Sequence, residues 1–163
     1  MQRRQFLIAL GSLSLLGGCG FHLPGGSTIP TSLQGLRIEA SGPAGGQLAQ
    51  AVERALERDG NVASADGPVL RLDNISLNQR AISISPSTGA ALEFLNTLRG
   101  SVWVQRGKKI LLPAEPLLVE QSFTYNSGTP LATNEQQIES QRQLFDEAAR
   151  VVLRRVLLAP ALR

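Results

Sequence analysis

Two side chains suited to nucleophilic or acid–base chemistry occur once each in the sequence, and they lie close together. Cys19 is the only cysteine and His22 the only histidine. A thiol and an imidazole can form a nucleophile–base pair or bind a metal, but either role requires a rigid scaffold. The segment around them contains Gly20, Pro24 and Gly25 and has no regular hydrophobic period. The pair is therefore a poor catalytic or metal-binding site.

Cys19 ends a segment that has the composition of an export signal. The arginines at positions 3–4 precede an apolar run over residues 6–16, which is too short to cross a hydrocarbon core of about 30 Å. Residues 16–19, Leu-Gly-Gly-Cys, resemble the lipobox of bacterial lipoproteins, in which the cysteine becomes the lipidated first residue. We therefore predict a lipoprotein signal peptide over residues 1–18 and a lipid anchor on Cys19. The alternative is an ordinary cleavage site beside a free thiol.

The residue that follows the cysteine bears on location. An aspartate there is associated with retention of lipoproteins in the inner membrane, whereas this chain has Gly20. We therefore expect an outer-membrane lipoprotein of a Gram-negative cell, anchored at the periplasmic leaflet. Each buried methylene of a palmitate or similar chain contributes about 0.8 kcal/mol, so several chains on one cysteine anchor durably. The paired arginines fit both Sec and twin-arginine export, and the route stays open.

Charge and length exclude other classes of protein. The net charge of +3 comes partly from the signal, and without it basic and acidic residues nearly balance. The basic pI is thus no argument for a nucleic-acid-binding protein. Residues 19–34 are rich in glycine and proline and predict a tether, and residues 35–163 suffice for a single domain. With its one cysteine lipidated, that domain would have no disulfide.

The first half of the domain predicts a strand followed by a helix. Residues 36–40 alternate apolar and polar side chains, which indicates a half-buried strand. After a turn at 41–45, Leu48, Val52, Ala55 and Leu56 form one stripe of a helix, which Gly60 would cap. The next strand begins near Leu70, and its alternation slips at Asp73-Asn74, which suggests a β-bulge.

Two more strands and a helix complete the pattern. Apolar residues keep one phase over 92–104, and Arg106-Gly107-Lys108-Lys109 predicts a hairpin loop. The return strand over 110–125 contains Pro113 and Pro116, so it is an edge strand or is broken there. A capping-box pattern at Thr133 predicts the start of the last helix. We expect an α+β fold, a two-layer sandwich with a mostly antiparallel sheet of about four strands and two helices on one face.

Charged residues on the predicted strands offer two kinds of site. Glu93, Glu115 and Glu120 could form a carboxylate site, but solvated sheet faces explain them equally well, and we predict no enzyme, cofactor or metal site. Cations beside Trp103 and in the hairpin loop could instead hold phosphates of an anionic lipid, and the alternative is that they only confer solubility. The candidate lipid-binding residues are Arg99, Arg106, Lys108 and Lys109.

The chain as a whole resembles the LptE family of LPS-assembly lipoproteins. The most specific segment follows the lipobox, Cys19 to Gly25, although Pro24 stands where relatives have arginine. Further similar segments are Thr28-Ile29-Pro30, Leu48-Ala49-Gln50-Ala51-Val52, Asp59-Gly60-Asn61-Val62 and Asn134-Glu135-Gln136.

This resemblance implies a role without catalysis. Members of the family act as plug and assembly factor in the LptD β-barrel, in lipopolysaccharide transport to the outer leaflet, and have no cofactor. The implied partners are an LptD-type barrel, lipopolysaccharide and the outer membrane, and the cations named above would contact LPS phosphates. The alternatives are a scaffold or pilot lipoprotein of another outer-membrane complex, and a periplasmic lipid-modifying enzyme.

Overall fold

The computed structural model describes residues 31–125 and 130–159, except the side chains of Ser32 and of residues 130–133. The predicted signal peptide, Cys19, His22 and the loop at 126–129 lie outside the described residues. The elements in chain order are η2 (Thr31–Leu33), β1 (Arg37–Ala40), α2 (Gly45–Arg58), β2 (Val69–Ile84), β3 (Ala91–Arg106), β4 (Lys109–Thr124) and α3 (Pro130–Leu158).

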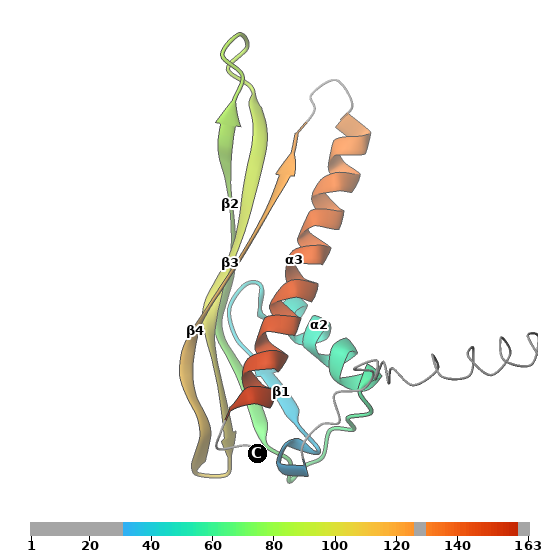
Figure 1. The fold of residues 1–163 in the computed structure, drawn as a ribbon, viewed down its shortest axis with the longest axis vertical. Coiled ribbons are helices and arrows are strands. Elements are labelled where there is room, and N and C mark those ends of the chain that lie inside the picture. Colours follow the sequence, from blue (N-terminus) through green and yellow to red (C-terminus); the bar gives the residue numbers. More distant parts are fainter. Residues whose placement is uncertain (1–30, 126–129, 160–163) are drawn as a thin grey trace, which may run out of the picture.

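The four strands form one sheet in the order β1-β2-β3-β4. β2, β3 and β4 pair antiparallel with their neighbours, whereas β1 lies parallel to β2 and connects to it through α2. Both helices lie on the same side of the sheet, where α2 packs on β1 and β2, α3 packs on β3 and β4, and the helices contact each other (Figure 1). The predicted α+β fold is confirmed, with a mixed rather than purely antiparallel sheet.

Alternation along the strands sets which side chains enter the core. In β3, Leu98, Val102 and Val104 face the helices and are buried. Leu48 and Val52 of α2 and Leu144 of α3 are buried against them in one cluster. A residue within the predicted tether, Leu33, also belongs to this cluster. The boundary of the tether stays a prediction.

Two local predictions are confirmed by the backbone. The register of β2 against β3 shifts between Asp73 and Ser76, and Asn74 in this bulge has a positive φ of 55°. At the end of α2, the N–H of Gly60 donates to the Glu57 carbonyl at 3.0 Å, and Gly60 has a φ of 79°. Such a left-handed residue is the usual glycine C-cap.

The structure answers one alternative that the sequence left open, and it moves one helix boundary. β4 is the outer strand of the sheet and continues through Pro113 and Pro116, so the predicted edge strand is confirmed. Its register against β3 also shifts at Pro113-Ala114, between Leu112 and Glu115, so the pairing is irregular at the first proline, as the other alternative held. α3 begins at Pro130, so the start predicted at Thr133 is wrong. A proline in the first helical turn loses no hydrogen bond and favours the helical φ, and this signal outweighed the capping-box pattern.

A polar layer crosses the interior between the sheet and α3. The side-chain amide of Gln79 donates to the Asn96 carbonyl oxygen at 3.0 Å, and the Asn96 amide donates to Ser140 Oγ at 3.5 Å. Asn96 and Ser140 are both buried. On one side of this layer lies the leucine- and valine-rich core, and on the other Phe94 stacks on Phe123 with 5.6 Å between ring centroids.

The hairpin of β2 and β3 extends beyond β4 and α3 (Figure 1). No described residue outside the hairpin pairs with its last residues, and Ile84 there is 62% exposed. The molecule therefore has a packed end, where β1, α2 and the end of α3 meet, and a slender end formed by this hairpin.

Candidate interaction surfaces

The sheet face turned away from the helices carries a mixture of charged, polar and large apolar side chains. None of the described helices packs on it, so its side chains meet solvent or a partner, apart from Thr97, which its neighbours bury (Figure 1). Leu118 on this face is 55% exposed. Alternation and register place the following side chains on it: Glu39, Arg71, Asp73, Ser76, Asn78, Arg80, Glu93, Leu95, Thr97, Arg99, Ser101, Trp103, Gln105, Leu118, Glu120 and Ser122. We call this surface the open face.

Trp103 is the centre of a fixed cluster on the open face. The guanidinium of Arg71 lies 5.2 Å from the centroid of its ring, which is a cation–π contact. The indole N–H donates to Asp73 Oδ2 at 2.6 Å, and Arg71 also forms an ion pair of 2.8 Å with Glu39. Tryptophan and arginine held in place in this way lose little entropy on binding, and both are enriched at binding hot spots.

The β-bulge in β2 positions one side of this cluster. Ser41 Oγ accepts from the Asn74 N–H at 3.0 Å and donates to Asp73 Oδ1 at 3.3 Å, so the bulge is tied to the loop after β1. The opposite residue in β3 is Gly100, and a Cβ at that position would lie 2.9 Å from the Asp73 carbonyl oxygen. Only a glycine lets the bulge approach β3 this closely.

The predicted phosphate-binding cations do not form one group. Arg106 and Lys109 stand opposite each other in the backbone register at the turn of the β3–β4 hairpin. Lys108 lies in the turn itself, next to Gly107, which has a φ of 56°. Arg99 is farther up β3, between Ser76 and Leu118, at a distance of about 23 Å along the strand at about 3.3 Å per residue. The hairpin cations form a basic corner at the packed end, and Arg99 belongs to the open face.

The carboxylates that would serve an enzyme are separated along the sheet. Glu93 pairs with Thr124, Glu120 pairs with Thr97 and accepts a hydrogen bond of 3.1 Å from its hydroxyl, and Glu115 lies opposite Val102. The register spreads them along the strands, so they do not converge on a common point. Within residues 31–125 and 130–159, no group of three metal-ligating side chains is found.

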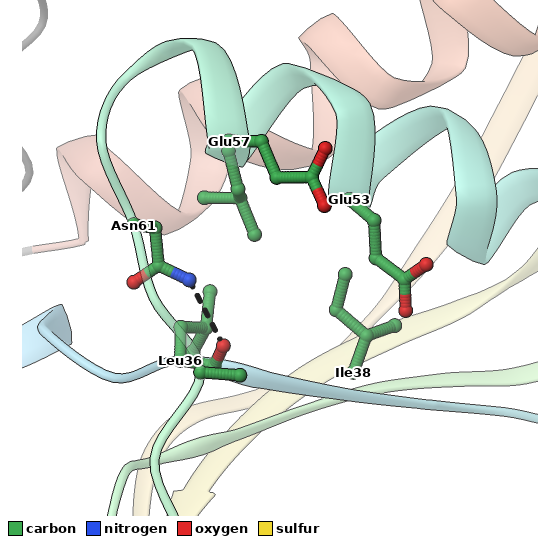
Figure 2. A pocket seen from close by; sticks show the side chains of 7 residues that line it. Leu36, Ile38, Glu53, Glu57 and Asn61 are labelled. Carbon is green, nitrogen blue, oxygen red and sulfur yellow. Dashed lines mark hydrogen bonds between the residues drawn. The ribbon is translucent and has the colours of Figure 1, made fainter.

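A small pocket lies between α2 and β1 (Figure 2). Its volume is about 220 Å³, and Leu36 and Ile38 lie below Glu53 and Glu57 in it. The Asn61 side-chain amide donates to the Leu36 carbonyl at 3.1 Å and so ties the loop after α2 to the start of β1. Glu53 and Glu57 are exposed on the surface of α2 above an aliphatic floor, and we assign no site to this pocket.

The described helices differ from membrane-spanning helices. None of them combines the length and the apolar character needed to cross a bilayer.

Comparison with known proteins identifies the family. The family model for lipopolysaccharide assembly, LptE, matches residues 33–156, which includes every element from β1 to α3 except the last residues of α3. The chain belongs to the LptE family. The LPS-assembly lipoprotein LptE of Photorhabdus laumondii is 33% identical, over 96% of this chain and 87% of that protein. The protein of the same name from Yersinia enterocolitica is 31% identical, over 99% of this chain and 79% of that protein.

Solved structures show the same fold. Lipoprotein B from Nitrosomonas europaea superposes with a TM-score of 0.64 at 20% identity, over 84% of this chain and 90% of that one. The rare lipoprotein B from Shewanella oneidensis superposes with a TM-score of 0.56 at 23% identity, over 73% of this chain and 90% of that one. The resemblance to the LptE family that the sequence suggested is confirmed.

Sequence reasoning missed part of the Trp103 cluster in this LptE-family chain. It placed Arg99 beside Trp103, whereas the side chains that contact the indole are Arg71 and Asp73. The alternation of Leu70, Arg71 and Leu72 could have indicated that Arg71 lies on the outer face. What could not be read from the pattern was the register that puts it opposite Trp103.

Proposed function

We propose that this LptE-family chain is an outer-membrane lipoprotein that forms a complex with an LptD-type β-barrel protein. It acts there as plug and assembly factor in lipopolysaccharide transport to the outer leaflet. Cys19 carries the lipid anchor in the periplasmic leaflet, and the chain has no catalytic role. Family membership and the names of its relatives support the part in LPS assembly.

The observation that carries the barrel partnership is the open face. A soluble two-layer domain normally hides tryptophan and leucine, yet this face presents Trp103 in a fixed cluster and Leu118 at 55% exposure. Polar and charged neighbours surround them, as expected for a surface that meets the polar interior wall of a barrel. The remaining face is covered by both helices, so the open face is the side that is left for a large partner.

The length of the sheet also suits a plug. β2, β3 and β4 each contain 16 residues, so each strand is about 53 Å long at about 3.3 Å per residue. The hydrocarbon core of a bilayer is about 30 Å thick. A body of this length inside a barrel would pass through the whole membrane, with the packed end left on the side of the anchor.

The first test is affinity purification of the lipidated full-length protein from outer membranes. We expect a large β-barrel of the LptD type in about equimolar amount. A matched pair of variants, Leu118→Glu on the open face and Ser64→Glu in an exposed loop, assigns the surface, since only the first should lower the yield of barrel. Purification without any barrel would reject the proposal and leave a scaffold or pilot role in another complex.

Contact with lipopolysaccharide is proposed for the cations that the sequence selected. Arg106, Lys108 and Lys109 form a basic corner that could bind phosphates, whereas Arg99 would contribute from a separate position on the open face. Phosphate groups pair well with arginine and lysine side chains. We propose both contacts, the one at the basic corner and the one at Arg99.

Charge reversal tests the basic corner. The double variant Lys108→Glu/Lys109→Glu should weaken binding of purified LPS about tenfold, as expected for the loss of two charged contacts. The control, Arg142→Glu/Arg150→Glu, makes the same charge change on exposed positions of α3 and should bind normally. Equal binding by both variants would reject this site and leave the plug role unaffected.

A further inference from the structure

β2 has one edge that is paired only at its beginning. On one side it pairs with β3 from Val69 to Ile84. On the other side β1 pairs only with residues 69–72. Beyond the bulge, the upper part of β2 rises away from β1 and α2, as Figure 1 shows. We call residues 76–84 of β2 the free edge.

The backbone directions on the free edge follow from the hydrogen bonds at Ile75. Its N–H donates to the Ser41 carbonyl and its carbonyl accepts from the Ala44 N–H, both at 3.0 Å, so both groups of Ile75 point away from β3. Backbone groups of alternate residues in a strand point to the same side. The N–H and C=O groups of Leu77, Gln79 and Ala81 therefore also point outward, and no described residue bonds to them.

Residues 76–81 of the free edge lack the proline, lysine, bulge or covering element that keeps exposed edges from pairing, and the next shift in the β2–β3 register comes only after Ala81. Proteins protect such edges with proline, lysine or a covering element. The opposite edge strand, β4, contains Pro113 and Pro116, whereas the free edge contains no proline and no lysine. It also carries Ile82 and Ile84, which are 42% and 62% exposed. An unprotected, partly apolar edge of this length is suited to accept another strand.

We propose that an extended segment of the β-barrel partner adds to the sheet at this edge and pairs with residues 77–81. This inference rests on the proposed function. Three outward residues offer three N–H donors and three C=O acceptors, so main-chain bonds would supply most of the recognition. Arg80 is the only charged residue on the free edge and forms no ion pair among the described residues, so the added segment should present a carboxylate beside it.

A second copy of this chain can pair along the whole of residues 77–81 only in a register that fits the edge poorly. Antiparallel self-pairing that sets Leu77 opposite Ala81 brings Ile84 of one copy beside Asn74 of the other. At that point the loop from Ser41 to Ala44 already occupies the edge. The hairpin end of each copy would therefore collide with this loop in the other.

The chain's own N-terminal segment is also a poor strand for this site. It contains Gly20, Gly25 and Gly26 together with Pro24 and Pro30. Glycine and proline are both depleted in strands. A segment of the partner is the occupant that remains.

Hydrogen exchange resolved to single amides tests the pairing in the purified lipidated complex and in the free lipidated chain. In the free chain, the amides of Asn78 and Arg80, which point to β3, should exchange slowly, and those of Leu77, Gln79 and Ala81 fast. In the complex we expect the last three to slow by about tenfold or more each, since each gains a backbone hydrogen bond. Contact by side chains alone would not give this alternation.

A pair of variants tests whether pairing contributes to assembly. Ala81→Pro removes one outward N–H and no bond of the β2–β3 ladder, and Ala81→Val keeps the N–H at the same position. We expect the proline variant to retain about a tenth of the wild-type amount of barrel and the valine variant to retain all of it. Circular dichroism of the free variants checks that both are folded.

The outcomes separate this inference from the proposed function. If wild-type chain binds the barrel but the outward amides gain no protection, strand addition is wrong and the plug role stands. If no barrel copurifies with the wild-type chain, the proposed function is wrong, and the strand addition that rests on it is rejected as well. Protection of the same amides in concentrated free chain would show self-pairing and would overturn the assigned occupant.

Discussion

Gly100 offers the most direct test of how the bulge is accommodated. A Cβ built at this position contacts Ile75 Cδ1 and lies 2.9 Å from the carbonyl oxygen of Asp73 and 3.2 Å from Ile75 Cα. The isoleucine methyl group can rotate away, but the backbone atoms belong to the bulge and cannot move without breaking its bonds to Ser41. Gly100→Ala should therefore destabilise the domain, although alanine is normally preferred to glycine in a strand.

The magnitude follows from two opposing effects. Overpacking a well-filled interior costs about 1–3 kcal/mol, and replacing glycine by alanine in an element interior returns about 0.5–1 kcal/mol. The free energy of unfolding should fall by about 1–2 kcal/mol, which corresponds to a decrease in Tm of about 4–8 °C for a domain of this size. Shortening the clashing side chain with Ile75→Val should recover part of this loss in the double variant.

Urea denaturation of the unlipidated mature chain, followed by circular dichroism, measures these changes. The matched control is Gly46→Ala in the first turn of α2, where a Cβ meets no atom within 4 Å. That variant should be as stable as the wild type or more stable by up to about 1 kcal/mol. A Gly100→Ala protein as stable as the control would refute the argument that the bulge requires close approach at Gly100.

Three further predictions concern the core, the polar layer and the Trp103 cluster. Leu72→Ala empties a fully buried position and should lower the free energy of unfolding by about 3–4 kcal/mol in the same denaturation assay. Asn96→Ala removes a fully buried amide and leaves its buried partner Ser140 unpaired, which should cost about 2–3 kcal/mol, whereas the exposed Asn78→Ala should change stability by less than about 0.5 kcal/mol. Arg71→Ala should cost about 0.5–1 kcal/mol and shift the fluorescence of Trp103, the only tryptophan.

Each of these predictions can fail in a specific way. A Leu72→Ala protein with nearly normal stability would show that the core is not continuous around β2. Equal effects of the two asparagine variants would mean that the polar layer contributes no more than a surface contact. Unchanged fluorescence in Arg71→Ala would show that the guanidinium does not rest on the indole ring in solution.

The sequence predicted those parts of the fold that depend on local patterns. The phase slip at Asp73-Asn74 located the bulge, and Gly60 located the end of α2, because both signals come from the backbone preferences of a few neighbouring residues. The order of elements followed from apolar periodicity. The antiparallel hairpins followed from short connections, as at Gly107.

The remaining features depend on contacts between distant residues. The parallel pairing of β1 with β2 arises from how α2 crosses the sheet, which no local pattern encodes. The cluster around Trp103 depends on the register that sets Arg71 of β2 opposite Trp103, whereas Arg99 lies four residues away from the ring on the same strand. Likewise, cations that are near in sequence, Arg99 and Arg106, are far apart because they lie on one extended strand.

The polar layer of Gln79, Asn96 and Ser140 has a consequence for cooperativity. Apolar packing is interrupted there, so the aromatic end and the leucine-rich end are joined by directional bonds instead of a shared hydrophobic core. The aromatic end should therefore open in a partial unfolding step of lower free energy, while the leucine-rich end stays folded until global unfolding. The aromatic residues lie toward the slender end and the leucine-rich core toward the packed end. A chain built in this way can adjust its slender end on binding a partner while the packed end keeps its structure.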